Sequence, residues 1–176
     1  MRALRVGDGG VRVDEVPAPL AAGEALVRVT LSGVCNTDLE LVRGYHGFSG
    51  VLGHEFVGRV EGPSGSALLG RRVVGEINLS CRRCTWCAEG LGRHCPRRTV
   101  LGIMGPPGAH AEWLTLPEAN LHAIPDSLDD VEAVFTEPLA AACEVLEQVD
   151  VRSGQRAAVL GVGKLGTLVA QVLRNA

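Results

Sequence analysis

Apolar and polar residues alternate along much of the first part of the chain, which is the pattern of strands with one buried face. The alternation is clearest over Glu24–Val34. Shorter runs of the same character are Arg2–Val6, Val11–Val16, Glu55–Glu61, Arg71–Ile77 and His110–Leu116. Gly9 and Gly10 separate the first two runs and predict a tight turn between them. The first part of the chain is therefore expected to be rich in β-structure.

Helical patterns are shorter and lie mostly later in the chain. Thr37–Val42 predicts one short helix. Ser127 can cap a second helix over Leu128–Phe135, since its hydroxyl can accept a hydrogen bond from a free N–H group of the first turn. Pro138 suits the first turn of a third helix that runs to about Val149.

The last part of the chain predicts the start of a dinucleotide-binding unit. Arg156–Leu160 is a short apolar run that predicts a strand, and a helix is expected over Thr167–Leu173. Between them lies the turn Gly161-Val162-Gly163-Lys164-Leu165-Gly166. In such a turn the first glycine allows the sharp bend, the second lets the backbone approach a pyrophosphate, and the third permits close packing of helix on strand.

These patterns divide the chain into a β-rich domain over residues 1–150 and the incomplete beginning of an α/β, Rossmann-type domain over residues 151–176. An acidic residue that reads the cofactor ribose is expected about 20 residues after the glycine turn. That position would lie beyond Ala176. The sequence therefore does not distinguish NAD from NADP.

Composition narrows the range of partners. Of the 176 residues, 46% are hydrophobic and the net charge is -3, without any basic block. Nucleic acid and anionic membranes are therefore not expected as partners. We see no signal peptide and no run of about 20 apolar residues, so a cytoplasmic location is expected. Because cytosolic thiols stay reduced, the six cysteines are expected to bind metal rather than to form disulfides.

Four of the cysteines lie within fifteen residues, in the segment from Cys81 to Cys95 that we call the cysteine lobe. The spacing Cys81-x-x-Cys84-x-x-Cys87, with Cys95 further on, suits a closed tetrahedral zinc site of structural type. An iron–sulfur cluster is the main alternative, but the ferredoxin pattern places its fourth cysteine after three residues and not after seven. Four unligated thiols are the remaining alternative.

A second group of possible ligands is dispersed along the chain: Cys35, His54, Glu55 and Glu137. Thiolate, imidazole and carboxylate are the ligand types of catalytic zinc, which keeps one position open for water or substrate. Each residue also has an ordinary interpretation, since a lone cysteine is often a buried small apolar residue and a glutamate often lies at a helix N-terminus.

The order of these motifs resembles the zinc-dependent medium-chain dehydrogenases, including the alcohol, polyol and threonine dehydrogenases. The resemblance rests on Cys35-Asn36-Thr37-Asp38, on Leu52-Gly53-His54-Glu55-Phe56-Val57-Gly58, on the cysteine lobe, on Glu137-Pro138-Leu139-Ala140 and on the glycine turn. It implies a GroES-like barrel followed by a Rossmann domain, with a catalytic and a structural zinc. It also implies a homo-oligomer that oxidises a secondary alcohol or polyol with NAD or NADP.

The resemblance makes Cys35 and His54 ligands of the catalytic zinc and leaves Glu55 and Glu137 as candidates for the third. Glutamate at 137, where simple alcohol dehydrogenases carry cysteine, is typical of the polyol and threonine branch, and that branch favours Glu55. Strand geometry favours Glu137 instead, because neighbouring residues such as His54 and Glu55 point to opposite faces unless the backbone bends. Both remain candidates.

Thr37 matches the hydroxyl that contacts the alcohol in this family, where it would relay the departing proton. Thr37 could also simply cap its helix. Asp38 would orient His54 through the second ring nitrogen. Many relatives carry a histidine where this chain has Glu40, so His46 is a possible substitute at the outer end of the relay.

The motifs also allow a protein of another class. A GroES-like domain that kept its zinc-stabilised scaffold but lacks the cofactor half would bind metal without catalysis, because a fold does not guarantee a function.

Overall fold

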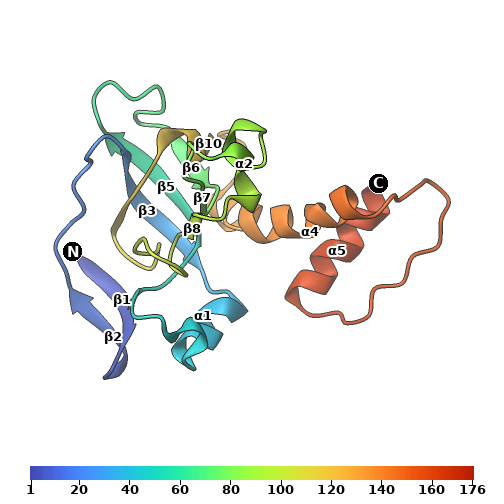
Figure 1. Cartoon of the computed structure of the whole chain (residues 1–176), viewed down its shortest axis with the longest axis horizontal. Coiled ribbons are helices and arrows are strands. Elements are labelled where there is room, and N and C mark those ends of the chain that lie inside the picture. The colour runs from blue at the N-terminus through green and yellow to red at the C-terminus, as the bar shows by residue number, and fades with distance from the viewer.

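The computed structural model describes residues 1–176 and shows a β-rich part followed by two helices that extend from it (Figure 1). The strands are β1 (Arg2–Gly7), β2 (Gly10–Glu15), β3 (Ala25–Gly33), β4 (Gly50–Val51), β5 (Glu55–Gly62), β6 (Arg72–Gly75), β7 (Asn78–Leu79), β8 (Thr99–Val100), β9 (Trp113–Leu116) and β10 (Leu121–Ala123). The α-helices are α1 (Asn36–Val42), α2 (Thr85–Ala88), α3 (Asp130–Ala133), α4 (Thr136–Gln148) and α5 (Lys164–Asn175).

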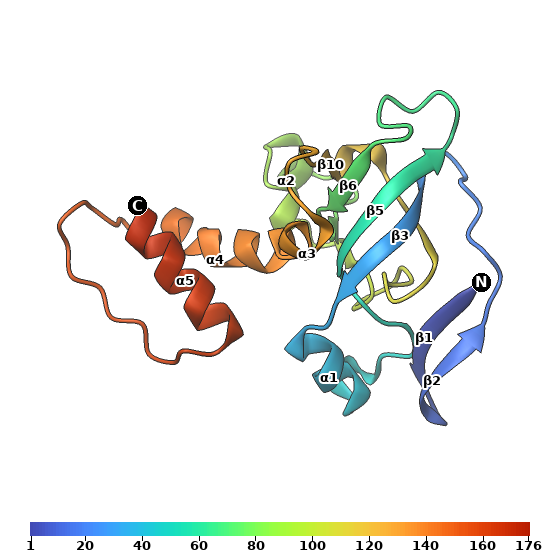
Figure 2. The ribbon, with the colours of Figure 1, turned by 180° about the vertical axis from the view of Figure 1, so that it is seen from behind.

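The strands form three antiparallel sheets. The largest has the order β10-β6-β5-β3-β9, and β2-β1-β4 and β7-β8 form smaller ones (Figures 1 and 2). An isolated bridge between Ala3 and Ala111 joins the first strand to the segment before β9. This bridge brings distant parts of the chain together beside β3 and β5, the strands that carry the candidate site.

The alternation in Glu24–Val34 produces the burial that it predicts. In β3, Ala25 and Val27 are buried and belong to the main hydrophobic core, whereas Arg28 is exposed. Strand β5 is buried on both faces, since Phe56 contributes to the main core and Val57 to a second cluster beneath α3. Burial of β5 on both sides gives the chain a rigid support directly after His54.

The helix over Leu128–Phe135 is shorter than predicted, and its cap is not Ser127. Helix α3 spans only Asp130–Ala133, and Asp129 is the cap because its carboxylate accepts the N–H of Glu132 at 2.8 Å. The guanidinium of Arg72 contacts the carboxylate of Asp130 and also the Leu128 carbonyl, which keeps Leu128 outside the helix. The following helix, α4, is confirmed, with Pro138 in its first turn.

The strand predicted over Arg156–Leu160 is wrong for this chain. The segment has no regular structure, and Leu160 is fully exposed. A strand needs a neighbour for its backbone hydrogen bonds, and the structure places no other strand beside these residues. The helix after the glycine turn is confirmed and is longer than predicted, because it begins at Lys164 and continues to Asn175.

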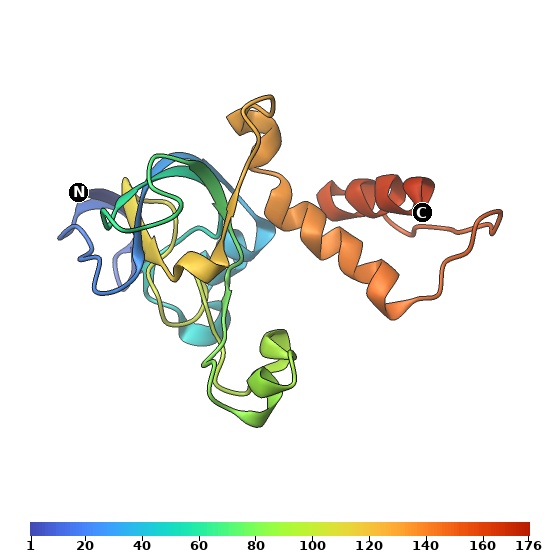
Figure 3. The same cartoon turned by 90° about the horizontal axis from the view of Figure 1, so that it is seen from above.

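Helix α4 leads away from the β-rich part, and α5 packs beside it (Figures 1 and 3). The cysteine lobe protrudes from another side of the β-rich part, so it is clearly separated from its core in Figure 3. None of these helices has both the length and the apolar character that a membrane crossing requires.

Candidate metal centres and glycine turn

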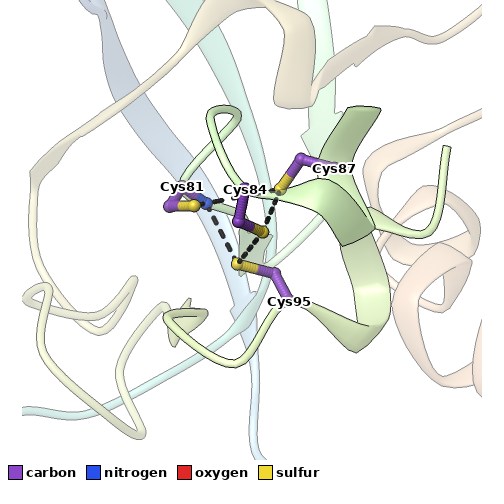
Figure 4. Close-up of side chains that lie close together, drawn as sticks. All are labelled: Cys81, Cys84, Cys87 and Cys95. Atoms are coloured by element: carbon purple, nitrogen blue, oxygen red, sulfur yellow. Dashed lines mark hydrogen bonds between the residues drawn. The ribbon is translucent and has the colours of Figure 1, made fainter. Parts of the chain in front are cut away.

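The four cysteines of the lobe converge on one point. Figure 4 shows their side chains approaching from the loop before α2, from α2 itself and from the loop after it. The sulfur atom of Cys87 lies 4.0 Å from that of Cys81 and 3.5 Å from that of Cys84, and the sulfurs of Cys84 and Cys95 are 3.7 Å apart. A tetrahedral zinc ion with Zn–S bonds of about 2.3 Å holds its sulfurs about 3.8 Å apart. The four thiols therefore fit a single zinc ion.

The same distances bear on the iron–sulfur alternative. In a [4Fe–4S] cluster each thiolate bonds a different iron atom, so the cysteine sulfurs lie further apart than around a single ion. The backbone N–H of Arg83 lowers the pKa of Cys81 to about 6, whereas the Cys87 N–H is outweighed by burial and the neighbouring thiols, which raise the pKa of Cys84 to about 11. The lobe thus offers closely spaced sulfur donors of the kind that close around one ion.

The second candidate site forms where β3, α1 and β5 meet. Cys35 precedes α1, while His54 and Glu55 stand at the start of β5. One donor atom from each of these three residues lies within 4.8 Å of the others. They are a sulfur, a ring nitrogen and a carboxylate oxygen, the donor set that catalytic zinc takes while one position stays open.

The structure also shows how adjacent residues reach one point. Gly53 has a φ of 97°, a conformation that side chains rarely adopt. This bend precedes His54, which lies just outside the strand, so the alternation rule does not separate His54 from Glu55. Any β-carbon on Gly53 would also collide with His110.

Of the two candidate carboxylates, Glu55 belongs to this three-residue group and Glu137 does not. Glu137 is in the first turn of α4 and faces the same region. Burial raises the pKa of its carboxyl, Glu55 and Glu76 raise it further, and His54 opposes them. Glu137 is therefore a nearby carboxylate, whereas Glu55 is in position to act as a ligand.

Cys35 and His54 lie close enough to shift each other's pKa. The hydrogen bond with His54 lowers the pKa of the Cys35 thiol. Burial opposes a charge on His54, but its contacts with Asp38 and Cys35 outweigh burial and raise its pKa to about 10. The thiolate is therefore favoured, and a metal ion would displace the proton of the ring.

Asp38 is buried beside these residues. It has an exposed fraction of 3%, accepts the N–H of Cys35 at 2.9 Å and lies 3.5 Å from Nδ1 of His54. Although burial opposes its charge, the contacts with His110, His54 and the Cys35 N–H hold the pKa of Asp38 well below its usual range. With Nδ1 facing Asp38, Nε2 of His54 is the nitrogen left for a metal.

Thr37 lies in the first turn of α1, next to Cys35. Helix α1 begins at Asn36 with Cys35 as its cap residue, so the alternative that Thr37 caps the helix is wrong. The Thr37 hydroxyl lies 3.7 Å from the Cys35 sulfur. Of the two positions considered for the outer end of the proton relay, Glu40 forms an ion pair with Arg43 on the surface, and His46 is exposed in the loop after α1.

The glycine turn lies near the second site. Gly161 has a φ of 102°, and a β-carbon on Gly166 would collide with the Gly161 carbonyl, so both positions require glycine. Gly163 is the cap residue of α5 and has open space around its α-carbon. The Lys164 ammonium donates to the Asn36 side chain at 3.1 Å, next to Cys35. Leu165 follows in the first turn of α5 and is exposed.

Two residues of this region were not predicted from the sequence. His110 precedes β9 and Ser32 lies in β3, and the Ser32 hydroxyl is 2.6 Å from Nδ1 of His110. Nε2 of the same ring is 3.6 Å from Asp38. No motif connects positions 32, 38 and 110, because only the sheet brings them together.

Comparisons with known proteins show the family of the chain. Residues 21–126 match the family model described as the alcohol dehydrogenase GroES-like domain. A sorbitol dehydrogenase from Halalkalibacterium halodurans is 32% identical over 96% of this chain and 51% of its own length. An L-threonine 3-dehydrogenase from a Chelativorans species is 35% identical over 93% and 50%.

A solved structure gives the same result for the fold. The Escherichia coli alcohol dehydrogenase RspB, in complex with NADH, is 30% identical and superimposes with a TM-score of 0.87. That alignment covers 99% of this chain and 53% of RspB. The chain spans about half the length of the curated relatives that it matches.

Proposed function

Since the chain belongs to the alcohol dehydrogenase family with a GroES-like domain, we propose that it carries the zinc centre of an NAD(P)-linked dehydrogenase for a secondary alcohol or polyol. The observation that carries this proposal is the convergence of Cys35, His54 and Glu55 within 4.8 Å of one another. Because the relatives are about twice as long, the activity is proposed for the whole protein.

The proposed ligands of the catalytic zinc are Cys35, His54 and Glu55, with Glu137 as the alternative to Glu55. When bound, zinc supplies a Lewis acid that polarises the alcohol oxygen and lowers the pKa of its hydroxyl. Cys81, Cys84, Cys87 and Cys95 are proposed to hold a second, structural zinc, which leaves no position for substrate.

Two residues beside the zinc centre are proposed to transfer the proton and to orient a ligand. The Thr37 hydroxyl, 3.7 Å from the Cys35 sulfur, is placed to accept the proton that leaves the alcohol. Asp38, 3.5 Å from Nδ1 of His54, would hold the ring so that Nε2 is free to bind the metal. Glu40 is engaged with Arg43 and His46 is exposed, so neither is proposed to extend the relay.

The hydride acceptor would be a nicotinamide dinucleotide held by Gly161, Gly163, Lys164, Leu165 and Gly166. We propose that residues 151–176 begin a Rossmann domain and that residues 1–150 form the GroES-like domain. The N-terminus of α5 then offers free N–H groups to the pyrophosphate. The hydrogen bond between Lys164 and Asn36 supports this assignment, because Asn36 is next to the proposed ligand Cys35.

The branch of the family suggests the substrate. Relatives named sorbitol and threonine dehydrogenase, together with glutamate at position 137, favour a polyol or a hydroxyl-bearing amino acid over a simple primary alcohol. A cytoplasmic location and a homo-oligomer are proposed on the same resemblance.

Turnover of the natural gene product tests the proposal. We expect reduced nicotinamide to form with members of a panel of secondary alcohols, polyols and L-threonine. Thr37→Ala should reduce kcat about a hundredfold or more, because a positioned proton acceptor contributes about that much, and Thr37→Ser should restore most of it. No turnover with any substrate and either cofactor would instead favour a non-catalytic, zinc-stabilised domain.

A further inference from the structure

Asp38 is the centre of a buried network that contains one more histidine than the proposed zinc centre uses. One carboxylate oxygen, Oδ1, accepts the Gly53 N–H at 3.1 Å and lies 3.5 Å from Nδ1 of His54. The other, Oδ2, accepts the Cys35 N–H at 2.9 Å and lies 3.6 Å from Nε2 of His110. Each oxygen therefore faces one backbone N–H and one imidazole ring.

Neither imidazole nitrogen that faces Asp38 has another partner. Nδ1 of His54 and Nε2 of His110 are both buried and make no hydrogen bond. At 3.5–3.6 Å their contact with the carboxylate is mainly electrostatic. A buried carboxylate needs donors around it, so both nitrogens should carry a proton toward Asp38.

Ser32 fixes the other side of the His110 ring. Its hydroxyl lies 2.6 Å from Nδ1 of His110 and 3.2 Å from the backbone carbonyl of Glu55. If the hydroxyl donates to Nδ1, the neutral ring carries its proton on Nε2. The 2.6 Å contact with Nδ1 is shorter than the 3.2 Å contact with the carbonyl and so favours donation to Nδ1, the arrangement in which Nε2 presents an N–H to Asp38.

The backbone around His110 is also tied to the segment that precedes His54. The His110 N–H donates to the Leu52 carbonyl at 2.8 Å, and the Ala109 N–H donates to the Gly53 carbonyl at 2.8 Å. His110 therefore has a fixed position relative to His54, although the two residues are far apart in the sequence.

We propose that His110, held by Ser32, is a positioning residue of the zinc centre, because it fixes Asp38 and through Asp38 the ligand His54. This inference rests on the proposed centre at Cys35, His54 and Glu55. His110 acts on the affinity and geometry of the metal site and does not touch the substrate.

Metal binding by the full chain tests this proposal. His110→Phe keeps a ring of similar size without an N–H, whereas His110→Gln returns a donor near the position of Nε2. We expect His110→Phe to weaken metal binding at the Cys35 site about tenfold, the lower end for partners of metal ligands. His110→Gln should recover most of the affinity. His122→Phe, on the exposed His122 of β10, is the matched control and should bind like the wild type.

The affinities come from competition of zinc with a chromophoric chelator, and the geometry comes from the absorption bands of bound cobalt(II). In both measurements the signal of Cys35→Ser is subtracted, because in this variant the cysteine lobe is the only candidate metal site that remains intact. His110→Phe with wild-type affinity and cobalt bands, and only a lower melting temperature, would show a packing role and overturn the proposal. If His110→Phe does not fold, Ser32→Ala should lose affinity relative to Ser32→Thr, and equal affinity of that pair overturns the proposal.

The controls separate the two levels of inference. If the wild type binds no more metal than Cys35→Ser, the zinc centre itself is wrong. If the wild type binds the additional ion and His110→Phe binds it equally well, only the role of His110 is wrong.

Discussion

Replacing Cys84 by serine should release one metal ion from the chain and loosen the cysteine lobe. Cys84 contributes to two of the short sulfur–sulfur distances, 3.5 Å to Cys87 and 3.7 Å to Cys95. The lobe has little apolar core of its own, since Trp86 is 47% exposed and Cys95 is the only buried residue between Cys81 and Cys95. A bound metal ion would therefore hold the lobe together in place of an apolar core.

The expected magnitude follows from the size of the closed loop. Cross-linking a loop of about 15 residues stabilises a protein by about 3 kcal/mol through the entropy of the unfolded chain. For a chain of this size each kcal/mol corresponds to about 2–4 °C in the melting temperature. Cys84→Ser should therefore lower the melting temperature by about 6–12 °C.

The assay combines metal analysis with thermal unfolding. Cys143, on α4, is exposed and belongs to neither group of candidate ligands, so Cys143→Ser is the matched control. It should keep the full zinc content and the wild-type melting temperature. Full metal content and an unchanged melting temperature in Cys84→Ser would refute the reasoning, and iron in place of zinc in a brown protein would establish the cluster instead.

Two further predictions concern stability. Gly108→Ala should lower the free energy of unfolding by about 1–3 kcal/mol and weaken metal binding, because the new β-carbon would collide with the backbone carbonyls of Leu52 and Gly53, just before His54. Chemical denaturation and metal competition measure the two effects. Gly65→Ala is the control, because its β-carbon enters open space, and it should change neither quantity. Asp130→Asn should lower the free energy of unfolding by about 1–2 kcal/mol near neutral pH. The reason is that a hydrogen bond from Thr30 and the guanidinium of Arg72 lower the pKa of Asp130 in the folded state. A group with a lowered folded-state pKa stabilises the protein above its unfolded pKa of about 4, and this stabilisation is lost as the pH falls through the folded pKa. The free energies of unfolding of the two proteins should therefore converge in acid. A difference that stays constant with pH would contradict this assignment.

Local patterns predicted the strands well where a strand buries one face against the main core. Glu24–Val34 is the clearest example, since its alternation matches the burial of Ala25 and Val27. The cysteine spacing was equally informative, because all four donors lie within one short segment whose geometry depends on few distant contacts.

The failures occurred where a structure depends on partners distant in sequence. The apolar run Arg156–Leu160 has no neighbouring strand to pair with in this chain, so its periodicity alone could not make it a strand. The choice between Glu55 and Glu137 stays a prediction, but the argument from strand alternation did not include the bend at Gly53, which places His54 outside the strand that carries Glu55. His110 was missed because its contact with Asp38 depends on the sheet and on no local motif.

The most direct test of the account is a crystal structure with anomalous diffraction measured at the zinc absorption edge. The account predicts two zinc peaks, one within the cysteine lobe and one bound by Cys35, His54 and Glu55. The Glu55 oxygen should lie about 2.0–2.2 Å from the second ion, with Glu137 nearby but outside direct bonding distance. A zinc peak in the cysteine lobe alone, with none between Cys35 and His54, would contradict the central claim.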